Sequence, residues 1–161
     1  MDAERLASVQ ALAEMLTARN LRVVTAESCT GGGIASALTD VAGSSSWFEC
    51  GFVTYSNEAK SRYLDVSPLV IEEFGAVSEQ TVREMVAGAV NNSLGDLAVA
   101  VSGIAGPGGG SLEKPVGTVW FAWGNEDQQI TECCHFDGDR ESVREQAVLH
   151  GIRGLCRWLC C

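Results

Sequence analysis

Apolar residues recur every three or four positions in some stretches of the chain and fill other stretches continuously. Residues 3–19 show the first pattern, with Leu12 and Leu16 on the apolar side, and predict an amphipathic helix that ends at Asn20. The same periodicity, with capping residues, predicts further helices over residues 31–38, 57–64, 67–75, 78–95 and 139–159. Short apolar runs predict strands over residues 22–26, 51–55, 97–101, 116–123 and 129–136.

The order of these elements predicts the fold class. Helices and strands alternate over the first hundred residues, which is typical of a parallel sheet covered by helices. The last two strands flank a short turn at residues 125–127, which favours antiparallel pairing. We therefore expect an α/β fold, a single three-layer α/β/α domain with a mixed β-sheet over residues 1–161.

The charge of the chain restricts its partners. A formal net charge of −10 argues against direct nucleic acid binding, which needs clustered Lys and Arg, but leaves room for a small anionic substrate. No apolar run approaches the roughly 20 residues that cross a bilayer, and the start of the chain does not resemble a signal peptide. We expect a cytoplasmic protein without a membrane partner, and composition leaves a homo-oligomer open.

The cysteines and histidines do not follow a metal-binding pattern. The seven cysteines are an odd number, and the chain has neither C-x₂-C spacing nor paired histidine ligands. We therefore expect reduced thiols, no metal site and no cofactor. The chain also lacks a G-x-S-x-G motif, and we interpret His135 and His150 as structural residues.

Four polar, glycine-rich segments lie where predicted strands end, the place where α/β folds bind ligands. They are Thr25–Gly33, Gly43–Lys60, Ala100–Gly110 and Phe136–Arg144. The third is neither a P-loop, which needs Gly-Lys before Ser or Thr, nor a dinucleotide fingerprint, because it leads into a strand. It is either a surface turn or a loop that lets a ligand approach the backbone.

Each of the other three segments has a functional and a structural interpretation. Ser28 and Thr30 precede the free amides of Gly31–Gly33, which either bind an anion or only shape a helix cap. Lys60 in the first turn of its helix is either a base of lowered pKa or a solvated lysine. Arg140 either binds a phosphate with its helix end or forms ion pairs with nearby acidic residues.

Taken together, the segments resemble the motifs of the CinA C-terminal-domain family. The matching stretches are TAESCTGG, AGSS-x-WF-x-x-GFVTYSNEAK, AVSGIAGP-GGS-x-EKPVGTVW and GDR-x-x-VR, and they span nearly the whole chain in the family's order. The stand-alone members are nicotinamide-nucleotide amidohydrolases. The resemblance implies a metal-free serine–lysine enzyme that deamidates nicotinamide mononucleotide to nicotinate mononucleotide and ammonia, in the recycling of pyridine nucleotides into NAD.

The resemblance also implies roles for individual residues. Ser45 is expected as the nucleophile and Lys60 as its base, with Tyr55 and Ser28 assisting at the amide. The choice among the three neighbouring serines stays open at this point. The residues expected around the substrate are Thr30, Gly31, Gly32, Ser44, Ser46, Ser102, Gly103, Gly106 and Arg140, the last of them on the phosphate.

Two other function classes compete with the enzyme. One is a non-catalytic nucleotide-binding module that uses the same pocket for sensing. The other is an interaction module in competence or the response to DNA damage, as the family's name suggests. Ammonia release from nicotinamide mononucleotide separates the enzyme from both.

Overall fold

The structure, a computed structural model, describes residues 2–161. The strands are β1 (Val23–Glu27), β2 (Phe48–Val53), β3 (Leu97–Gly103), β4 (Thr118–Gly124) and β5 (Gln129–His135). The helices are α1 (Ala3–Arg19), α2 (Gly33–Thr39), α3 (Asn57–Leu64), α4 (Pro68–Phe74), α5 (Glu79–Asn91) and α6 (Arg140–Cys160), with a 3₁₀ turn at Ser44–Ser46. Among these residues no helix is both long and apolar enough to cross a membrane.

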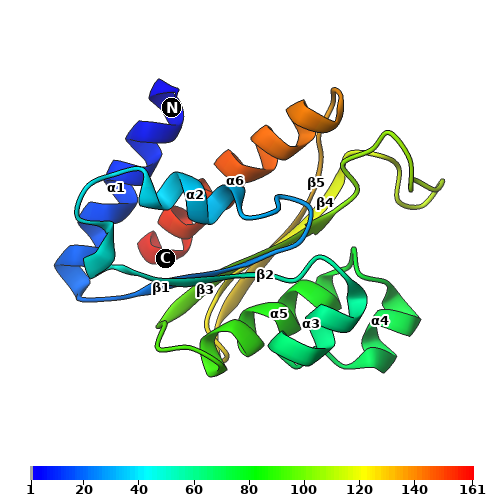
Figure 1. Ribbon diagram of the computed structural model, residues 1–161, viewed down its shortest axis with the longest axis horizontal. Coiled ribbons are helices and arrows are strands. Elements are labelled where there is room, and N and C mark those ends of the chain that lie inside the picture. The colour runs from blue at the N-terminus through cyan, green and yellow to red at the C-terminus, as the bar shows by residue number, and fades with distance from the viewer. Residues whose placement is uncertain (1) are drawn as a thin grey trace.

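The strands form one mixed sheet in the order β2-β1-β3-β4-β5. β1 pairs in parallel with both β2 and β3, and the antiparallel pairs β3–β4 and β4–β5 complete the sheet. Helices α1, α2 and α6 cover one face, and α3, α4 and α5 cover the other (Figure 1). The predicted α/β/α fold with a mixed sheet is thus confirmed.

Two apolar clusters hold the layers together, one on each face of the sheet. The larger cluster joins α1 and α6 to β3 and β4 through residues such as Leu12, Phe121 and Ile152, all of which are fully buried. The smaller cluster packs Val82 and Met85 of α5 against the opposite face. Burying a large aliphatic or aromatic side chain contributes about 1.5–3 kcal/mol, so both clusters stabilise the packing of the helices on the sheet.

Several local predictions are confirmed because side chains within one turn decide them. Ser56 and Ser78 cap α3 and α5 by accepting from the amides three residues later. Asn20 ends α1 in the left-handed conformation, and Pro68 begins α4. Two boundaries are wrong: β2 begins at Phe48, three residues before the predicted strand, and ends at Val53, and α5 ends at Asn91, four residues before the predicted end.

Candidate active site

The loops that follow β1 and β2 leave the sheet on opposite faces. The loop after β1 leads into α2 on one face, and the loop after β2 leads into α3 on the other (Figure 1). Two adjacent parallel strands whose connections diverge leave a crevice at their carboxyl ends, which is the usual ligand site of open α/β sheets. Ser28 follows β1 and Lys60 lies in α3, so the crevice brings two of the predicted catalytic residues together.

Lys60 reaches into this crevice from the first turns of α3. Its Nζ lies 2.9 Å from Ser28 Oγ, 2.9 Å from the carbonyl oxygen of Thr54 and 3.1 Å from that of Tyr55. The side chain is 1% exposed, and Lys60 forms no ion pair within residues 2–161. A lysine held by three uncharged oxygens has lost its hydration without gaining a counter-charge.

Burial lowers the pKa of Lys60 to about 8 from its ordinary value of 10.5. Of the two interpretations of Lys60 from the sequence, the lowered pKa favours the first, with desolvation rather than the helix dipole as the main cause. A pKa near 8 leaves a useful fraction of the side chain as a neutral amine at neutral pH, and a neutral amine beside a serine hydroxyl can accept its proton.

Cys29, next to Ser28, is a competing nucleophile that its environment suppresses. Its thiol is buried, and burial raises its pKa to about 11. The thiol therefore stays protonated at neutral pH, and the thiolate is the reactive form of cysteine. The serine hydroxyl that contacts Lys60 is the better candidate.

A buried carboxylate, Glu27, fixes the turn that carries Ser28. It is fully buried and accepts from Thr30 Oγ1 at 2.6 Å and from the amides of Ile34 and Ala35 at 2.9 and 3.0 Å. The carboxylate thus caps the positive end of α2, where a negative charge is favourable. The proton of the Thr30 hydroxyl is donated to Glu27, so the backbone of Thr30, rather than this proton, faces the crevice as a possible donor to substrate.

Arg144 holds the same turn from the opposite side. Its Nε and Nη2 donate to the carbonyl oxygens of Cys29 and Thr30 at 3.0 and 3.2 Å. A Cβ atom on Gly31 would lie 3.1 Å from the Arg144 guanidinium, and Gly31 and Gly32 both have positive φ. The two glycines are therefore required for the turn to close against this arginine.

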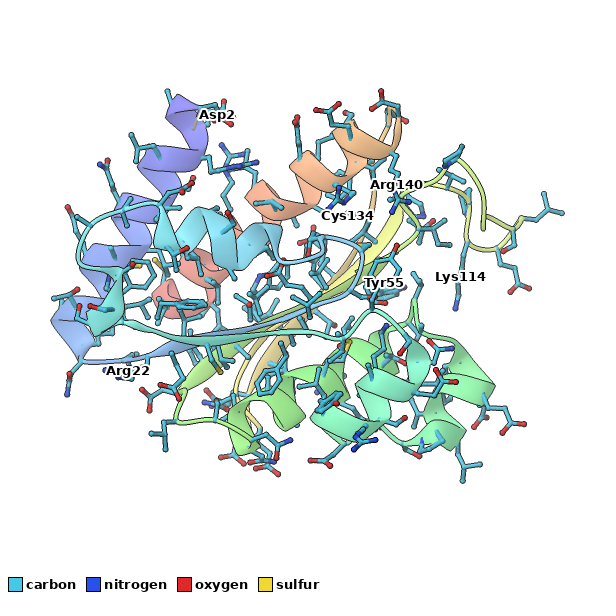
Figure 2. All side chains as sticks on the ribbon, viewed as in Figure 1. Asp2, Arg22, Tyr55, Lys114, Cys134 and Arg140 are labelled. Carbon is cyan, nitrogen blue, oxygen red and sulfur yellow. The ribbon has the colours of Figure 1, made fainter. Side chains whose placement is uncertain are left out.

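Tyr55, Arg140 and Gly106 meet at the rim of the crevice. Arg140 donates to the carbonyl oxygen of Gly106 at 2.9 Å and to the Tyr55 hydroxyl at 3.2 Å. Figure 2 shows Tyr55 and Arg140 on the same side of the molecule, from segments 85 residues apart. Arg140 forms no ion pair with another described residue, so the ion pairs considered from the sequence are absent there.

Ser102 and Gly103 lie on the β3 side of Ser28. The Ser28 amide donates to the carbonyl oxygen of Val101 at 3.0 Å, which continues the β1–β3 pairing and brings Ser102 alongside. Ser102 is buried, with 2% of its surface exposed. The structure therefore brings Ser102 and Gly103 to the same edge of the sheet as Ser28 and Lys60.

The structure does not bring Ser44, Ser45 and Ser46 to this site. They form the 3₁₀ turn before β2, whereas Lys60 follows the opposite end of that strand. A six-residue strand at about 3.3 Å per residue separates them by roughly 20 Å. The predicted pairing of Ser45 with Lys60 is wrong, because β2 starts at Phe48 and carries the chain away from the serines.

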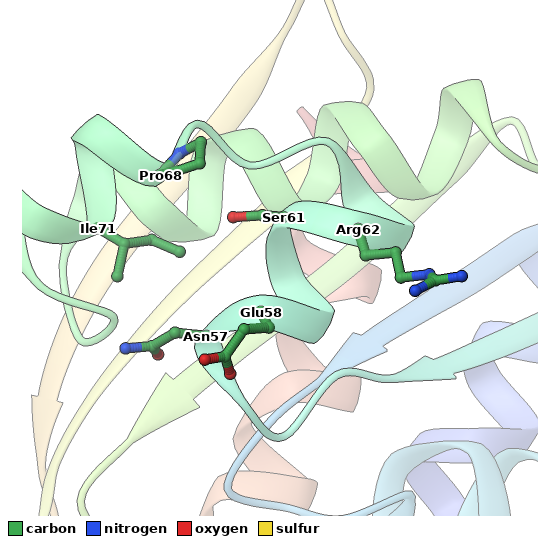
Figure 3. Close-up of a pocket in the computed structure, with 6 residues that line it drawn as sticks. All are labelled: Asn57, Glu58, Ser61, Arg62, Pro68 and Ile71. Carbon is green, nitrogen blue, oxygen red and sulfur yellow. The ribbon is translucent and has the colours of Figure 1, made fainter.

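A cavity of about 520 Å³ lies on the outer side of α3 (Figure 3). Its lining residues are Asn57, Glu58, Ser61, Arg62, Pro68 and Ile71. None of them belongs to the Ser28–Lys60 pair, because α3 turns Lys60 and Leu64 toward the core. The cavity is therefore separate from the candidate active site.

The fold and this site together define an α/β protein with a buried serine–lysine pair at a strand-end crevice. Solved structures share the fold. The competence/damage inducible protein CihA from Agrobacterium tumefaciens is 41% identical with a TM-score of 0.95, covering 100% of this chain and 98% of that one. The CinA superfamily protein KP700603 from Klebsiella pneumoniae 700603 is 41% identical with a TM-score of 0.93, covering 97% and 98%.

The chain belongs to the CinA C-terminal domain family, which matches residues 6–159. Two curated relatives are similar over most of their length, and both are named nicotinamide-nucleotide amidohydrolase PncC. The protein from Pseudomonas putida is 56% identical over 89% of this chain and 90% of its own. The protein from Escherichia coli K12 is 50% identical over 96% of this chain and 94% of its own.

Proposed function

We propose that this protein hydrolyses the carboxamide of nicotinamide mononucleotide, with Ser28 as nucleophile and Lys60 as general base. The observation that carries the proposal is the 2.9 Å contact between Lys60 Nζ and Ser28 Oγ at a buried site without a counter-charge. The names of the relatives that are 50–56% identical, nicotinamide-nucleotide amidohydrolase, support this substrate. Ser28 replaces Ser45 as the proposed nucleophile because Ser28 is the serine within reach of the lysine.

The contacts of Lys60 orient its amine for proton transfer. A neutral amine has two N–H bonds and one lone pair. The carbonyl oxygens of Thr54 and Tyr55 accept the two N–H bonds, at 2.9 and 3.1 Å. The lone pair then faces the hydroxyl of Ser28, which is the arrangement that a base needs to take the serine proton.

The reaction proceeds in two acyl-transfer steps. Ser28 Oγ attacks the carboxamide carbon and its proton passes to Lys60 Nζ, which then donates it to the departing nitrogen. Ammonia leaves and an ester on Ser28 remains. Lys60 next takes a proton from water, whose oxygen attacks the ester carbon, and returns it to Ser28 Oγ as nicotinate mononucleotide is released.

Backbone amides of the turn after Ser28 are suited to stabilise the oxyanion in both steps. The amides of Gly31 and Gly33 already donate to the carbonyl oxygens of Ser28 and Thr30. Those of Thr30 and Gly32 have no acceptor among the described residues, so we assign the oxyanion to them. Removing one such donor typically slows an enzyme by about 100- to 1,000-fold.

Arg140 is our candidate for the phosphate of the nucleotide. It is a cation at the start of α6, it has no carboxylate partner among the described residues, and it touches Tyr55 beside the crevice. A guanidinium and a helix N-terminus together favour a phosphate group. The proposed reaction returns nicotinamide mononucleotide to NAD synthesis, and a cytoplasmic location fits that role.

The proposal is tested by incubating the purified protein with nicotinamide mononucleotide and a chelator while ammonia and nicotinate mononucleotide are measured together. We expect the two products to accumulate at equal rates, and Ser28→Ala to abolish both. Binding of the nucleotide without either product would instead support the sensing module. A gel shift with duplex DNA at physiological salt, without turnover of the nucleotide, would support the DNA-related role.

A further inference from the structure

Three potential metal ligands converge at β5, the edge strand of the sheet opposite to β2. Glu132 and Cys134 are two residues apart on β5 and therefore project from the same face. His150 of α6 completes the cluster: its Nε2 lies 2.9 Å from Glu132 Oε1 and 3.4 Å from Cys134 Sγ. Cys134 lies beneath α6 in Figure 2. The three donor atoms all lie within 4.8 Å of one another.

The cluster is distant from the proposed reaction. β5 is the edge strand, and β3 and β4 lie between it and β1, so about 14 Å of sheet separates it from Ser28. The amidohydrolase mechanism uses none of these residues. The cluster therefore requires an explanation of its own.

The geometry argues against a nucleophilic triad. In a triad, one nitrogen of the histidine faces the nucleophile and the other faces the carboxylate. Here the same atom, Nε2, faces both Cys134 Sγ and Glu132 Oε1. The imidazole cannot take a proton from the thiol at the nitrogen that already contacts the carboxylate. Donor atoms that all face one point are instead typical of metal ligands.

The spacing of the donors is close to that of a tetrahedral zinc site. Bonds of about 2.0–2.1 Å to nitrogen and oxygen and about 2.3 Å to sulfur place N and S about 3.5 Å apart and N and O about 3.3 Å apart. The corresponding distances here are 3.4 and 2.9 Å. These two distances differ from the zinc values by a few tenths of an ångström, and the donor atoms of Glu132 and Cys134 lie within 4.8 Å of each other.

Neighbouring side chains hold the histidine in place. The rings of Phe121, Trp123 and Phe136 surround the imidazole of His150, with centroids 4.9, 5.7 and 6.0 Å away. This apolar wall restricts the rotamers of His150 and lowers the local dielectric constant, and both effects strengthen metal binding. A cavity of about 230 Å³ lined in part by His150 gives solvent a path to the ring.

The charge balance also fits a divalent cation. A thiolate at Cys134 and a carboxylate at Glu132 supply two negative charges. Arg157 donates to Glu132 Oε1 at 2.9 Å and offsets one of them, while its guanidinium rests over the Trp123 ring. Arg157 also fixes the orientation of the Glu132 carboxylate, as outer partners of metal ligands do.

We propose that Glu132, Cys134 and His150 form a Zn²⁺ site, with water as the fourth ligand, that ties the edge strand β5 to α6. Thiolate, imidazole and carboxylate together suit Zn²⁺ rather than Mg²⁺ or Ca²⁺, which prefer oxygen ligands. Binding exchanges the thiol proton of Cys134 for the metal and releases it to solvent. The site lies away from Ser28 and Lys60, so amide hydrolysis does not depend on it.

The test is a titration of the chelator-treated protein with Co²⁺, which reports thiolate ligation through its charge-transfer absorption band, followed by displacement with Zn²⁺. We expect one metal ion per chain. Cys134→Ser and His150→Gln should each weaken binding at least about 100-fold. Cys133→Ser is the matched control, because this neighbouring thiol projects from the other face of β5. The double variant Cys160→Ser/Cys161→Ser controls for the exposed C-terminal thiols.

Thermal unfolding gives a second readout that does not use the enzyme. Zn²⁺ at 100 times its dissociation constant should raise Tm by about 5–10 °C in the wild type and in both controls. Cys134→Ser and His150→Gln should fold, by circular dichroism, and show no such shift. The proposal is overturned if the wild type gives no cobalt–thiolate band. It is equally overturned if the band survives in both ligand variants or disappears in the Cys160→Ser/Cys161→Ser variant.

Discussion

The pH dependence of the reaction follows from the state of Lys60. The lysine is active only as the neutral amine, and its pKa is lowered to about 8 by burial. With that pKa the neutral fraction rises from about 9% at pH 7 to about 91% at pH 9. We therefore expect kcat/KM for amide hydrolysis to rise about tenfold over this range and to level off above it.

The assay measures ammonia release at substrate concentrations below KM between pH 6.5 and pH 9.5. The phosphate of the nucleotide has a second pKa of about 6 and is fully ionised well above pH 7. The rise of kcat/KM between pH 7 and pH 9 therefore reflects an ionisation of the enzyme. Nicotinamide riboside, which lacks the phosphate, repeats the profile without that ionisation. Lys114→Gln should leave the inflexion unchanged because Lys114 is bound to the carbonyl oxygen of Phe74, away from Ser28. A flat profile between pH 7 and pH 9 would refute the assignment of Lys60 as base.

The same pKa shift affects stability, with a sign that can be worked out. Between pH 8 and 10.5 the unfolded chain keeps the proton on Lys60 and the folded chain has lost it, so this group makes the protein more stable as pH rises. From pH 8 to pH 9.5 the contribution grows by about 1.6 kcal/mol. Urea unfolding measures the unfolding free energy of wild type and Lys60→Met at each pH. The difference between the two proteins isolates the contribution of Lys60, because the other ionisable groups are the same in both. An unchanged difference between the two proteins across this range would mean that the pKa is not lowered.

Three further predictions concern individual side chains. Lys60→Arg should abolish ammonia release, because arginine stays protonated; turnover near the wild-type rate would exclude a base at this position. Arg140→Ala should reduce kcat/KM about tenfold to a hundredfold for nicotinamide mononucleotide and far less for the riboside, whereas an equal loss on both would make Arg140 a structural residue. Glu27→Gln should lower the unfolding free energy in urea by about 2–4 kcal/mol, because an amide nitrogen replaces an acceptor of the α2 amides; a loss within 0.5 kcal/mol would contradict a charged cap.

The sequence was sufficient where local chemistry decides the structure. The caps at Ser56 and Ser78, the proline at the start of α4 and the left-handed Asn20 all act within a turn of their own helix. The order of the elements was enough to predict a mixed sheet between two helical layers, because the short loops allow few other arrangements.

The pairing of residues across the site could not be predicted in the same way. Ser28 and Lys60 are 32 residues apart, and their contact depends on β1 and β2 lying side by side in parallel. The predicted strand begins at Gly51, which leaves the serines and Lys60 close along the chain. In the structure the strand is Phe48–Val53, and it separates the serine turn from Lys60. Glycine is uncommon inside strands, so the sequence pattern places Gly51 at the start of one. Gly51 instead lies within β2 and pairs with Thr25, whose Oγ1 fills the space that a Cβ atom on residue 51 would need.

Two residues that shape the site carry a sequence signal of their own. Glu27 ends β1 and precedes the glycine-rich start of α2 by a few residues, which is where an acidic cap is favourable. Arg144 lies four positions after Arg140, which places it on the same side of α6, and it donates to the turn that carries Ser28. The Glu132–Cys134–His150 cluster had no such signal, because α6 and β5 meet only in the folded chain.

The central claim, that Ser28 is the nucleophile, is tested most directly by the covalent intermediate. The protein is mixed with nicotinamide mononucleotide, quenched in acid within the first turnover, digested and sequenced by tandem mass spectrometry. We predict an ester on Ser28 whose added mass is that of the nucleotide less ammonia, and no ester in Ser28→Ala, while Ser45→Ala still forms it. An ester on Ser45, or full turnover by Ser28→Ala, would contradict the account.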